Sequence, residues 1–99
     1  MKDLAITELY DCYSALLSDK QRTVFEFYYD DDLSLSEIAE HTRTTRQGVR
    51  DLIKRSEEQL RDFEECLGLN KKYTRLREIA AECENRELAR EIEAVISEN

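Results

Sequence analysis

The sequence contains no proline, and its 99 residues include only two glycines, Gly48 and Gly68. These are the residue types that interrupt helices most strongly, so their scarcity leaves long helices possible. Valine, isoleucine and threonine are too scattered to indicate strands. We therefore expect an all-α protein.

Long hydrophobic runs are also missing. No segment approaches the roughly 20 apolar residues that a membrane-spanning helix needs. The N-terminal stretch carries acids at Asp3, Glu8 and Asp11 and has no apolar centre, which excludes a signal peptide. We expect a soluble, cytoplasmic protein without membrane insertion. A chain this short buries a limited share of its surface, so a homodimer is one way to enlarge its core.

Cysteine chemistry has little support in the sequence. The three cysteines, Cys12, Cys66 and Cys83, are odd in number and form no C-x-x-C pair, which argues against disulfides and zinc. We expect them to pack as small, half-buried hydrophobic residues. The sequence also lacks a nucleophile–base pair, a glycine-rich phosphate loop and a metal-ligating cluster. We therefore expect no enzyme, no cofactor and no metal.

Positive charge is scarce overall, since the net charge is −8. Proteins that bind nucleic acid usually carry an excess of lysine and arginine, because contacts to phosphates supply most non-specific affinity. The charge is uneven, however: residues 1–32 carry −5, residues 33–57 carry +1, and residues 58–99 carry −4. Any basic face is therefore expected within the middle segment.

Apolar residues recur at helical spacing along the chain. Two serine capping boxes, Ser18 with Gln21 and Ser34 with Glu37, mark the starts of helices. Thr45 is the expected N-cap of a long helix, with Thr44 as the alternative, and Gly68 is its expected C-terminal stop. The expected helices cover about 3–17, 19–29, 36–41 and 46–67. The expected apolar face of the first comprises Leu4, Leu9, Cys12, Tyr13, Leu16 and Leu17, and that of the last comprises Val49, Ile53, Ser56, Leu60 and Phe63, continued by Cys66 and Leu67. The aromatic side chains of these helices are expected in a core rather than stacked on bases: Tyr10, Tyr13, Phe25, Phe27, Tyr28 and Tyr29.

After Gly68 the composition becomes more charged, and two apolar stripes follow. One comprises Leu69, Tyr73, Leu76, Ala80 and Cys83, and the other Leu88, Ile92, Val95 and Ile96. The stripes fall out of step near residues 84–86, which leaves one curved helix or two helices open. We expect a core of residues 1–68 and a helical extension of residues 69–99 that packs on that core or on a dimer partner.

A short helix, a tight turn over residues 41–44 and a second helix follow the helix-turn-helix plan. Ile38, Ala39, Val49 and Ile53 are expected to face inward. The exposed candidates for nucleic-acid binding are then Thr45, Arg46, Gln47, Arg50 and Lys54. Arginine can pair with guanine and glutamine with adenine, whereas lysine suits a phosphate. Thr45 could cap the helix and touch a phosphate at once.

Three motifs carry a resemblance to a known family: "LSDKQR" at 17–22, the pattern of "YY", "DD" and "LSLSEIAE" across 28–40, and the pattern of "RQ", "V", "D", "IKR", "E" and "L" across 46–60. The chain resembles the YlxM family of small bacterial proteins and region 4 of sigma factors. The resemblance implies a sigma-region-4-like helix-turn-helix bundle with a C-terminal helical extension. It also implies a gene beside those of the targeting GTPases Ffh and FtsY, and a regulatory role in the signal recognition particle pathway.

Two functions remain open at this stage. The first is a regulatory protein that contacts DNA or the RNA of the signal recognition particle through the face from Thr45 to Lys54. The second is a protein–protein adaptor that modulates a targeting GTPase and binds no nucleic acid, an activity that suits an acidic surface and a basic partner.

Overall fold

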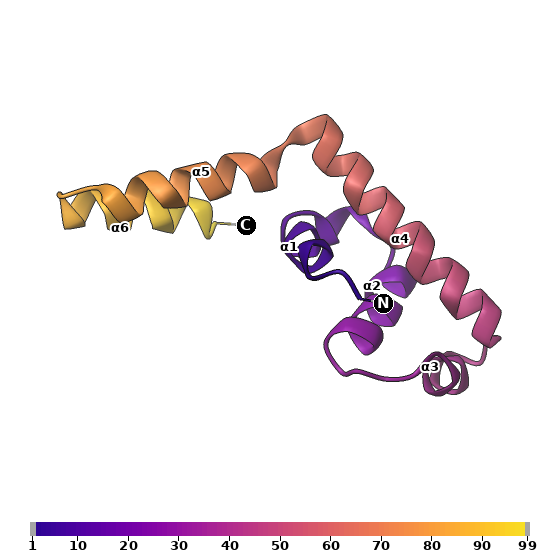
Figure 1. Ribbon diagram of the computed structural model, residues 1–99. Coiled ribbons are helices and arrows are strands. Elements are labelled where there is room, and N and C mark those ends of the chain that lie inside the picture. Colours follow the sequence, from indigo (N-terminus) through magenta and orange to yellow (C-terminus); the bar gives the residue numbers. More distant parts are fainter. Residues whose placement is uncertain (1, 99) are drawn as a thin grey trace. The chain divides into compact units, whose positions relative to one another are not determined.

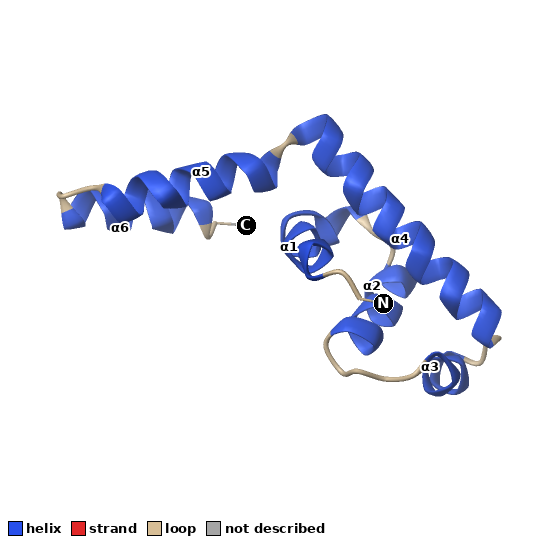
Figure 2. Cartoon of the chain, in the orientation of Figure 1, coloured by secondary structure: helices blue, strands red, loops and turns tan. Residues whose placement is uncertain are grey.

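The computed structural model describes residues 2–98, which form helices and no strand (Figures 1 and 2). The expectation of an all-α protein is confirmed. In chain order the elements are α1 (Leu4–Tyr13), the 3-10 turn η1 (Ser14–Leu16), α2 (Asp19–Tyr29), α3 (Leu35–Thr42), α4 (Arg46–Leu67), α5 (Leu69–Glu82) and α6 (Arg86–Ile96). No helix in this described range is long and apolar enough to cross a membrane.

The chain divides into two compact units, residues up to 66 and residues from 67 onward. The first unit holds α1 to α3 and nearly all of α4, and the second holds α5 and α6. Each unit has its own buried residues, and the two differ in the side chains that fill them.

Both predicted capping boxes are present in the first unit. The Ser18 hydroxyl accepts from the backbone N–H of Gln21 at 3.2 Å, and the Ser18 N–H donates to the Gln21 amide oxygen at 2.9 Å. Ser34 and Glu37 exchange the same two bonds at 3.1 and 3.0 Å. Each box satisfies donors that a helix start leaves unpaired, so the starts of α2 and α3 are set by local sequence.

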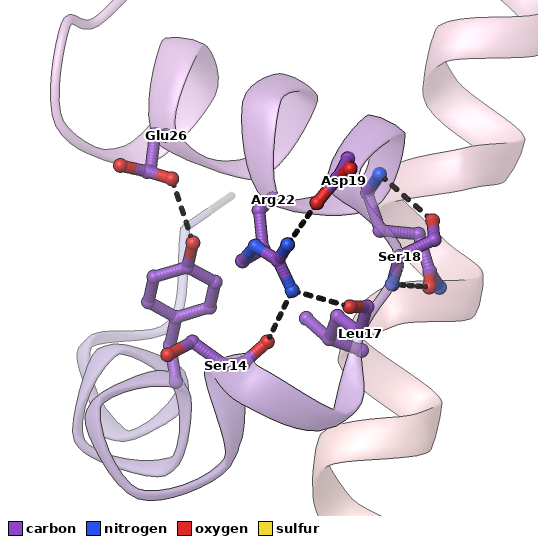
Figure 3. A network of polar contacts seen from close by, with 8 residues as sticks. Ser14, Leu17, Ser18, Asp19, Arg22 and Glu26 are labelled. Atoms are coloured by element: carbon purple, nitrogen blue, oxygen red, sulfur yellow. Dashed lines mark hydrogen bonds and ion pairs between the residues drawn. The ribbon is translucent and has the colours of Figure 1, made fainter. Parts of the chain in front are cut away.

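The predicted first helix over 3–17 is too long. Helix α1 ends at Tyr13, and η1 turns the chain before α2 begins. Arg22 is the physical reason, because its guanidinium reaches back to accepting carbonyls of this corner, at 3.2 Å to Ser14 and 2.5 Å to Leu17 (Figure 3). The same guanidinium pairs with the carboxylate of Asp19. A side chain of α2 thus replaces the helical bonds that the turn gives up.

The buried face of α1 also differs from the prediction. Leu4 is 80% exposed and Leu16 is 57% exposed, whereas Ile6, which the pattern missed, is fully buried with Leu9 and Tyr13. The turn at η1 removes Leu16 from the helical phase of α1, so spacing counted across the break gives the wrong face.

Aromatic rings fill the core of the first unit, as expected. Phe25 lies between two tyrosine rings, with ring centroids 4.2 Å from Tyr10 and 4.3 Å from Tyr29. The two tyrosine hydroxyls donate to the carboxylates of Glu26 and Glu57. Burial, and then these donations to carboxylates, raise the pKa of both tyrosines. The aromatic stack is therefore closed at both ends by polar partners.

Helix α4 buries the face that its spacing predicted: Val49, Ile53, Ser56 and Leu60. The Ser56 hydroxyl donates to the carbonyl of Leu52 at 2.8 Å and accepts from Gln21 at 3.3 Å, so its burial leaves no polar atom unsatisfied. The expected continuation of this face through Cys66 and Leu67 is wrong. Both are exposed, because the core of the first unit ends with the ring of Phe63 against Tyr13.

In the second unit α6 runs back along α5 (Figure 1). The extension is therefore two helices rather than one, and Asn85 caps the second by accepting from the N–H of Leu88 at 3.1 Å. Gly68 stops α4 as predicted, with a φ of 62° that favours glycine. Between the helices Ala80, Ala89 and Ile96 are buried. The cysteine expectation holds for Cys12 and Cys83, which are half-buried, and fails for Cys66.

Candidate nucleic-acid interface

The connection between α3 and α4 is a tight turn held by threonine hydroxyls. The N–H of Thr44 donates to the carbonyl of Ala39 at 3.0 Å, and the Thr42 hydroxyl donates to the carbonyl of Ile38 at 2.8 Å. The hydroxyls of Thr42 and Thr44 lie 2.8 Å apart and share a hydrogen bond. These local bonds satisfy the carbonyls that α3 leaves open, and they fix the angle at which α4 begins.

Thr45 is the N-cap of α4. Its hydroxyl accepts from the N–H of Gly48 at 2.9 Å, and its carbonyl accepts from the N–H of Val49 at 3.0 Å. The sequence left Thr44 as an alternative, and the structure selects Thr45. A Cβ on Gly48 would lie 3.0 Å from the Thr45 hydroxyl, which is tighter than ordinary contact. Glycine at this position therefore leaves room for the cap.

Five buried residues support the turn from beneath: Val24, Ile38, Ala39, Val49 and Ile53. Four of these are the side chains that the helix-turn-helix pattern placed inward, and Val24 adds the contribution of α2. Because α2, α3 and α4 share this cluster, the outer face of α4 is presented by a packed scaffold rather than by a loop.

The outer face of α4 carries the predicted side chains Arg46, Gln47, Arg50 and Lys54, and all four are exposed. Arg46, Arg50 and Lys54 follow one another at four-residue spacing, which aligns them along one side of the helix. Gln47 lies beside this line and donates to the carboxylate of Asp51 at 2.9 Å. Thr45 is exposed just before them. The structure thus brings the five candidates together, and their contact with nucleic acid stays a prediction.

Arg43, which the sequence analysis missed, is an exposed arginine that ends α3, two residues before the cap of α4. It ends α3 in the left-handed conformation, with φ 54° and ψ 43°, where helices usually place glycine or asparagine. An ordinary side chain in that conformation costs about 1–2 kcal/mol. An exposed arginine therefore occupies a position where glycine is less strained. The signal was present in the sequence, because no glycine occurs in the turn.

A hollow lies on each side of the first turns of α4. One, of about 420 Å³, is lined by Tyr28, Leu35, Arg50, Ile53, Lys54 and Glu57. The other, of about 270 Å³, is lined by Lys20, Val24, Thr44, Gly48, Val49, Asp51, Leu52 and Arg55. Each combines basic side chains with one carboxylate and an apolar floor. The basic side chains therefore form a line along the exposed side of α4, whereas each hollow beside it also contains a carboxylate that offsets part of the positive charge.

The Glu37 carboxylate, in the first turn of α3, stays ionised at neutral pH. Donation from the backbone N–H of Ser34, and then from its hydroxyl, lowers the pKa of Glu37 below its ordinary value. Between residues 2 and 98 no three histidine, cysteine, aspartate or glutamate side chains are grouped so that they could hold a metal ion. The exposed side chains of the α4 face offer ionic and hydrogen-bonding contacts.

A short helix, a threonine-capped turn and a long helix with an exposed basic line define a helix-turn-helix protein. The chain belongs to the UPF0122 family, whose model matches residues 1–98 and is described as "Putative helix-turn-helix protein, YlxM / p13 like". The resemblance to the YlxM family is confirmed.

Relatives of this chain occur in several bacteria and are named as proteins of the same family. It is 54% identical over 70 residues to one from Clostridium botulinum, which covers 71% of this chain and 64% of the relative. A relative from Caldanaerobacter subterraneus is 56% identical over 70 residues, covering 71% and 60%. One from Geobacillus kaustophilus is 50% identical over 78 residues, covering 79% and 71%. The chain thus spans less than two thirds of the first two relatives.

Proposed function

We propose that this chain is a nucleic-acid-binding regulatory protein of the cytoplasm that acts by binding rather than by catalysis. Its contact surface is the outer face of α4, formed by Thr45, Arg46, Gln47, Arg50 and Lys54 and extended by Arg43. The observation that carries the proposal is the exposed line of Arg46, Arg50 and Lys54 on a capped helix that follows a helix-turn.

The residues of the face suit different parts of a nucleic acid. Arg46 and Gln47 lie in the first turn of α4, the part of a recognition helix that reaches base edges in the major groove. Arg50 and Lys54 lie one and two turns further on, where they can contact bases or phosphates. The Thr45 oxygen accepts from Gly48, which leaves its hydroxyl hydrogen for a phosphate oxygen.

The charge of the chain sets the expected strength of binding. With a net charge of −8 the protein as a whole is repelled by nucleic acid, so attraction comes from a few side chains on one face. Each neutralised phosphate of a duplex contributes roughly −0.9 to the slope of log affinity against log salt. We expect a shallow slope of roughly −2 to −3, and affinity that depends on base contacts more than on bulk charge.

A resemblance to the YlxM family supports the choice of ligands to test. We propose two: duplex DNA and the RNA of the signal recognition particle. Fluorescence anisotropy with each ligand, at several salt concentrations, measures both affinity and slope. The variant Arg46→Ala/Arg50→Ala is expected to lose about tenfold or more in affinity, because each arginine that pairs with a base is worth about 1–3 kcal/mol.

The matched control is Arg77→Ala/Arg90→Ala, which removes the same charge from exposed positions in the second unit. It is expected to change affinity far less than the test variant. Equal losses in the two variants would show that the chain responds only to net charge. Unchanged complexes in Arg46→Ala/Arg50→Ala would exclude the face of α4 as the contact.

A second candidate is an adaptor that modulates a targeting GTPase such as Ffh or FtsY and binds no nucleic acid. The acidic balance outside residues 33–57 favours it, since such a surface complements a basic protein partner. Its test is the rate of GTP turnover by each purified GTPase with and without the chain. A changed rate, together with no retained DNA or RNA, would support the adaptor over the nucleic-acid-binding protein.

A further inference from the structure

The second unit leaves large apolar side chains in solvent. Leu76 and Ile79 of α5 are 38% and 42% exposed, and Leu88 and Val95 of α6 are 46% and 61% exposed. The residues buried between the two helices are Ala80, Ala89 and Ile96, so two of the three are alanines. Several large side chains of this unit therefore lie in solvent, outside the buried seam.

Helical geometry places the four exposed side chains on one face. Helices α5 and α6 run antiparallel (Figure 1). Ala80 and Ala89 are buried, one on each helix, so they mark the seam between the two helices. Ile79 and Leu88 each directly precede one of these alanines in the sequence. One residue corresponds to a rotation of about 100° about the helix axis, and because the two helices are antiparallel, this rotation turns both side chains toward the same side of the pair. Leu76 and Val95 fall on that side by the same count. We call these four residues the hairpin face.

The hairpin face is large in relation to the unit that carries it. Units of fewer than about 40 residues rarely bury enough surface to be stable by themselves, and the second unit has 33 residues. Helices in such a unit bury more apolar surface when another layer of helices covers the hairpin face. Covering the hairpin face with another helix pair would produce a four-helix bundle with large side chains at its centre.

The charges beside the face favour a second copy of this chain as that cover. On α5, Arg75 lies at the outer edge of the hairpin face, and the outer edge of α6 carries Glu87 and Glu91. Arg75 and Glu91 lie on the same side of the alanine pair, away from the loop. A two-fold axis parallel to the helices sets each α5 over the α6 of the other copy, and it therefore brings Arg75 of one copy toward Glu91 of the other.

Arg75 is available for this exchange. Its present partner is Glu78, one turn along the same helix, at 3.2 Å, and both side chains are more than half exposed. An exposed pair of this kind contributes little to stability. The alternative axis, perpendicular to the helices, would place α6 over α6 and bring acids together.

We propose that the hairpin face docks against the hairpin face of a second copy, forming a two-fold dimer in which α5 of each copy lies over α6 of the other. The proposal does not depend on nucleic-acid binding, because it concerns only the second unit. The docking surface is self-complementary in charge, since Arg75 of each copy faces Glu91 of the other.

Sedimentation of the full chain from nanomolar to micromolar concentration tests the dimer. The wild type is expected to pass from monomer to dimer. The variant Ile79→Glu/Leu88→Glu, which places four like charges in the dimer interface, is expected to raise the dissociation constant by about a hundredfold or more. A wild type that stays monomeric throughout would overturn the proposal, and so would a variant that dimerises normally.

The matched control is Leu4→Glu/Leu16→Glu, which makes the same change at two exposed leucines of the first unit. Its dissociation constant is expected to stay at the wild-type value. A loss as large as that of the test variant would place the interface elsewhere. Circular dichroism of each variant checks that the helices persist.

A charge exchange tests the orientation without altering the apolar residues. Arg75→Glu and Glu91→Arg are each expected to raise the dissociation constant by about three- to tenfold, because each affects two symmetric pairs. The combined variant Arg75→Glu/Glu91→Arg restores opposite charges and is expected to return to near the wild-type value. Additive weakening in the combined variant would contradict the two-fold arrangement.

Discussion

The two units of this chain hold their helices together in different ways. In the first unit, Phe25 lies between two tyrosine rings, and hydroxyl–carboxylate bonds connect α1 and α4 with α2. In the second unit two alanines and one isoleucine are buried between two helices, and larger apolar side chains face outward. The first unit therefore contains its own core, whereas the second buries few residues fully and leaves several large apolar side chains in solvent.

This contrast separates stability from association. A unit that buries large side chains internally resists unfolding by itself, because buried apolar area is the main stabilising contribution. A unit that exposes them gains stability when a partner covers them. The α4 face belongs to the self-contained unit, so the candidate nucleic-acid contacts are held rigidly even if the second unit changes partners.

The substitution Phe25→Ala should disrupt the first unit most. It removes a fully buried ring from the centre of the aromatic stack and leaves a cavity, at a cost of about 3–5 kcal/mol. Urea unfolding followed by tyrosine fluorescence measures the loss. Leu88→Ala, at an exposed position of the second unit, is the comparison and should leave this transition unchanged. Equal losses of unfolding free energy in the two variants would show that the two units do not differ in where their stabilising residues lie.

Ala80→Leu attacks the seam of the second unit. Ala80 is fully buried, and a larger side chain there would push α5 and α6 apart, at a cost of about 1–3 kcal/mol. Amide hydrogen exchange is expected to speed up in α5 and α6 and to stay unchanged in α2. Faster exchange in α2 as well would show that the two units unfold together.

Thr45→Ala tests the cap of α4 within the first unit. Loss of the hydroxyl removes the bond from the N–H of Gly48 and should lower the free energy of unfolding by about 1 kcal/mol. Thr45→Ser keeps the acceptor and should retain most of that stability. Chemical denaturation of the three proteins provides the comparison, and a serine variant as weak as the alanine variant would assign the effect to the lost methyl group.

Arg43→Gly separates stability from binding at one position. Glycine relieves the left-handed strain but enlarges the entropy of the unfolded chain, so the net gain in stability should be less than about 1 kcal/mol. Affinity for nucleic acid should fall in the same variant. A variant that is stabilised and binds as tightly as the wild type would remove Arg43 from the interface.

Glu37→Gln gives the smallest expected change, and it depends on pH. The lowered pKa of Glu37 means that its ionised form stabilises the fold, fully above its ordinary pKa of 4.5 and progressively less as the pH falls through the lowered value. The wild type should therefore lose more stability than the variant below pH 4.5. Thermal unfolding across that range measures the difference, and parallel curves would show that the capping bond carries no charge dependence.

Local chemistry explains which features were predictable. Both capping boxes, the cap at Thr45 and the stop at Gly68 depend on contacts within a few residues, and each was foreseen. The inward face of α4 was also predictable, because its spacing runs unbroken from Val49 to Leu60. Once the inward positions of α4 were assigned, the remaining polar positions of its first turns were the candidates for nucleic-acid binding.

Features that depend on distant residues were missed. Helix α1 is shorter than expected because Arg22, from the next helix, bonds to the carbonyls of its corner. The break between α5 and α6 was left undecided, since the cap at Asn85 competes with a chain composition that favours continuous helix.

Sequence alone therefore determined that the chain is helical, where most of its helices begin, and which residues of α4 face outward, because these properties follow from periodicity and capping over short distances. Tertiary structure decided which apolar side chains are buried and which remain in solvent. That distinction depends on what packs against each helix face, and the spacing of apolar residues in α5 and α6 does not show which of them the neighbouring helix covers.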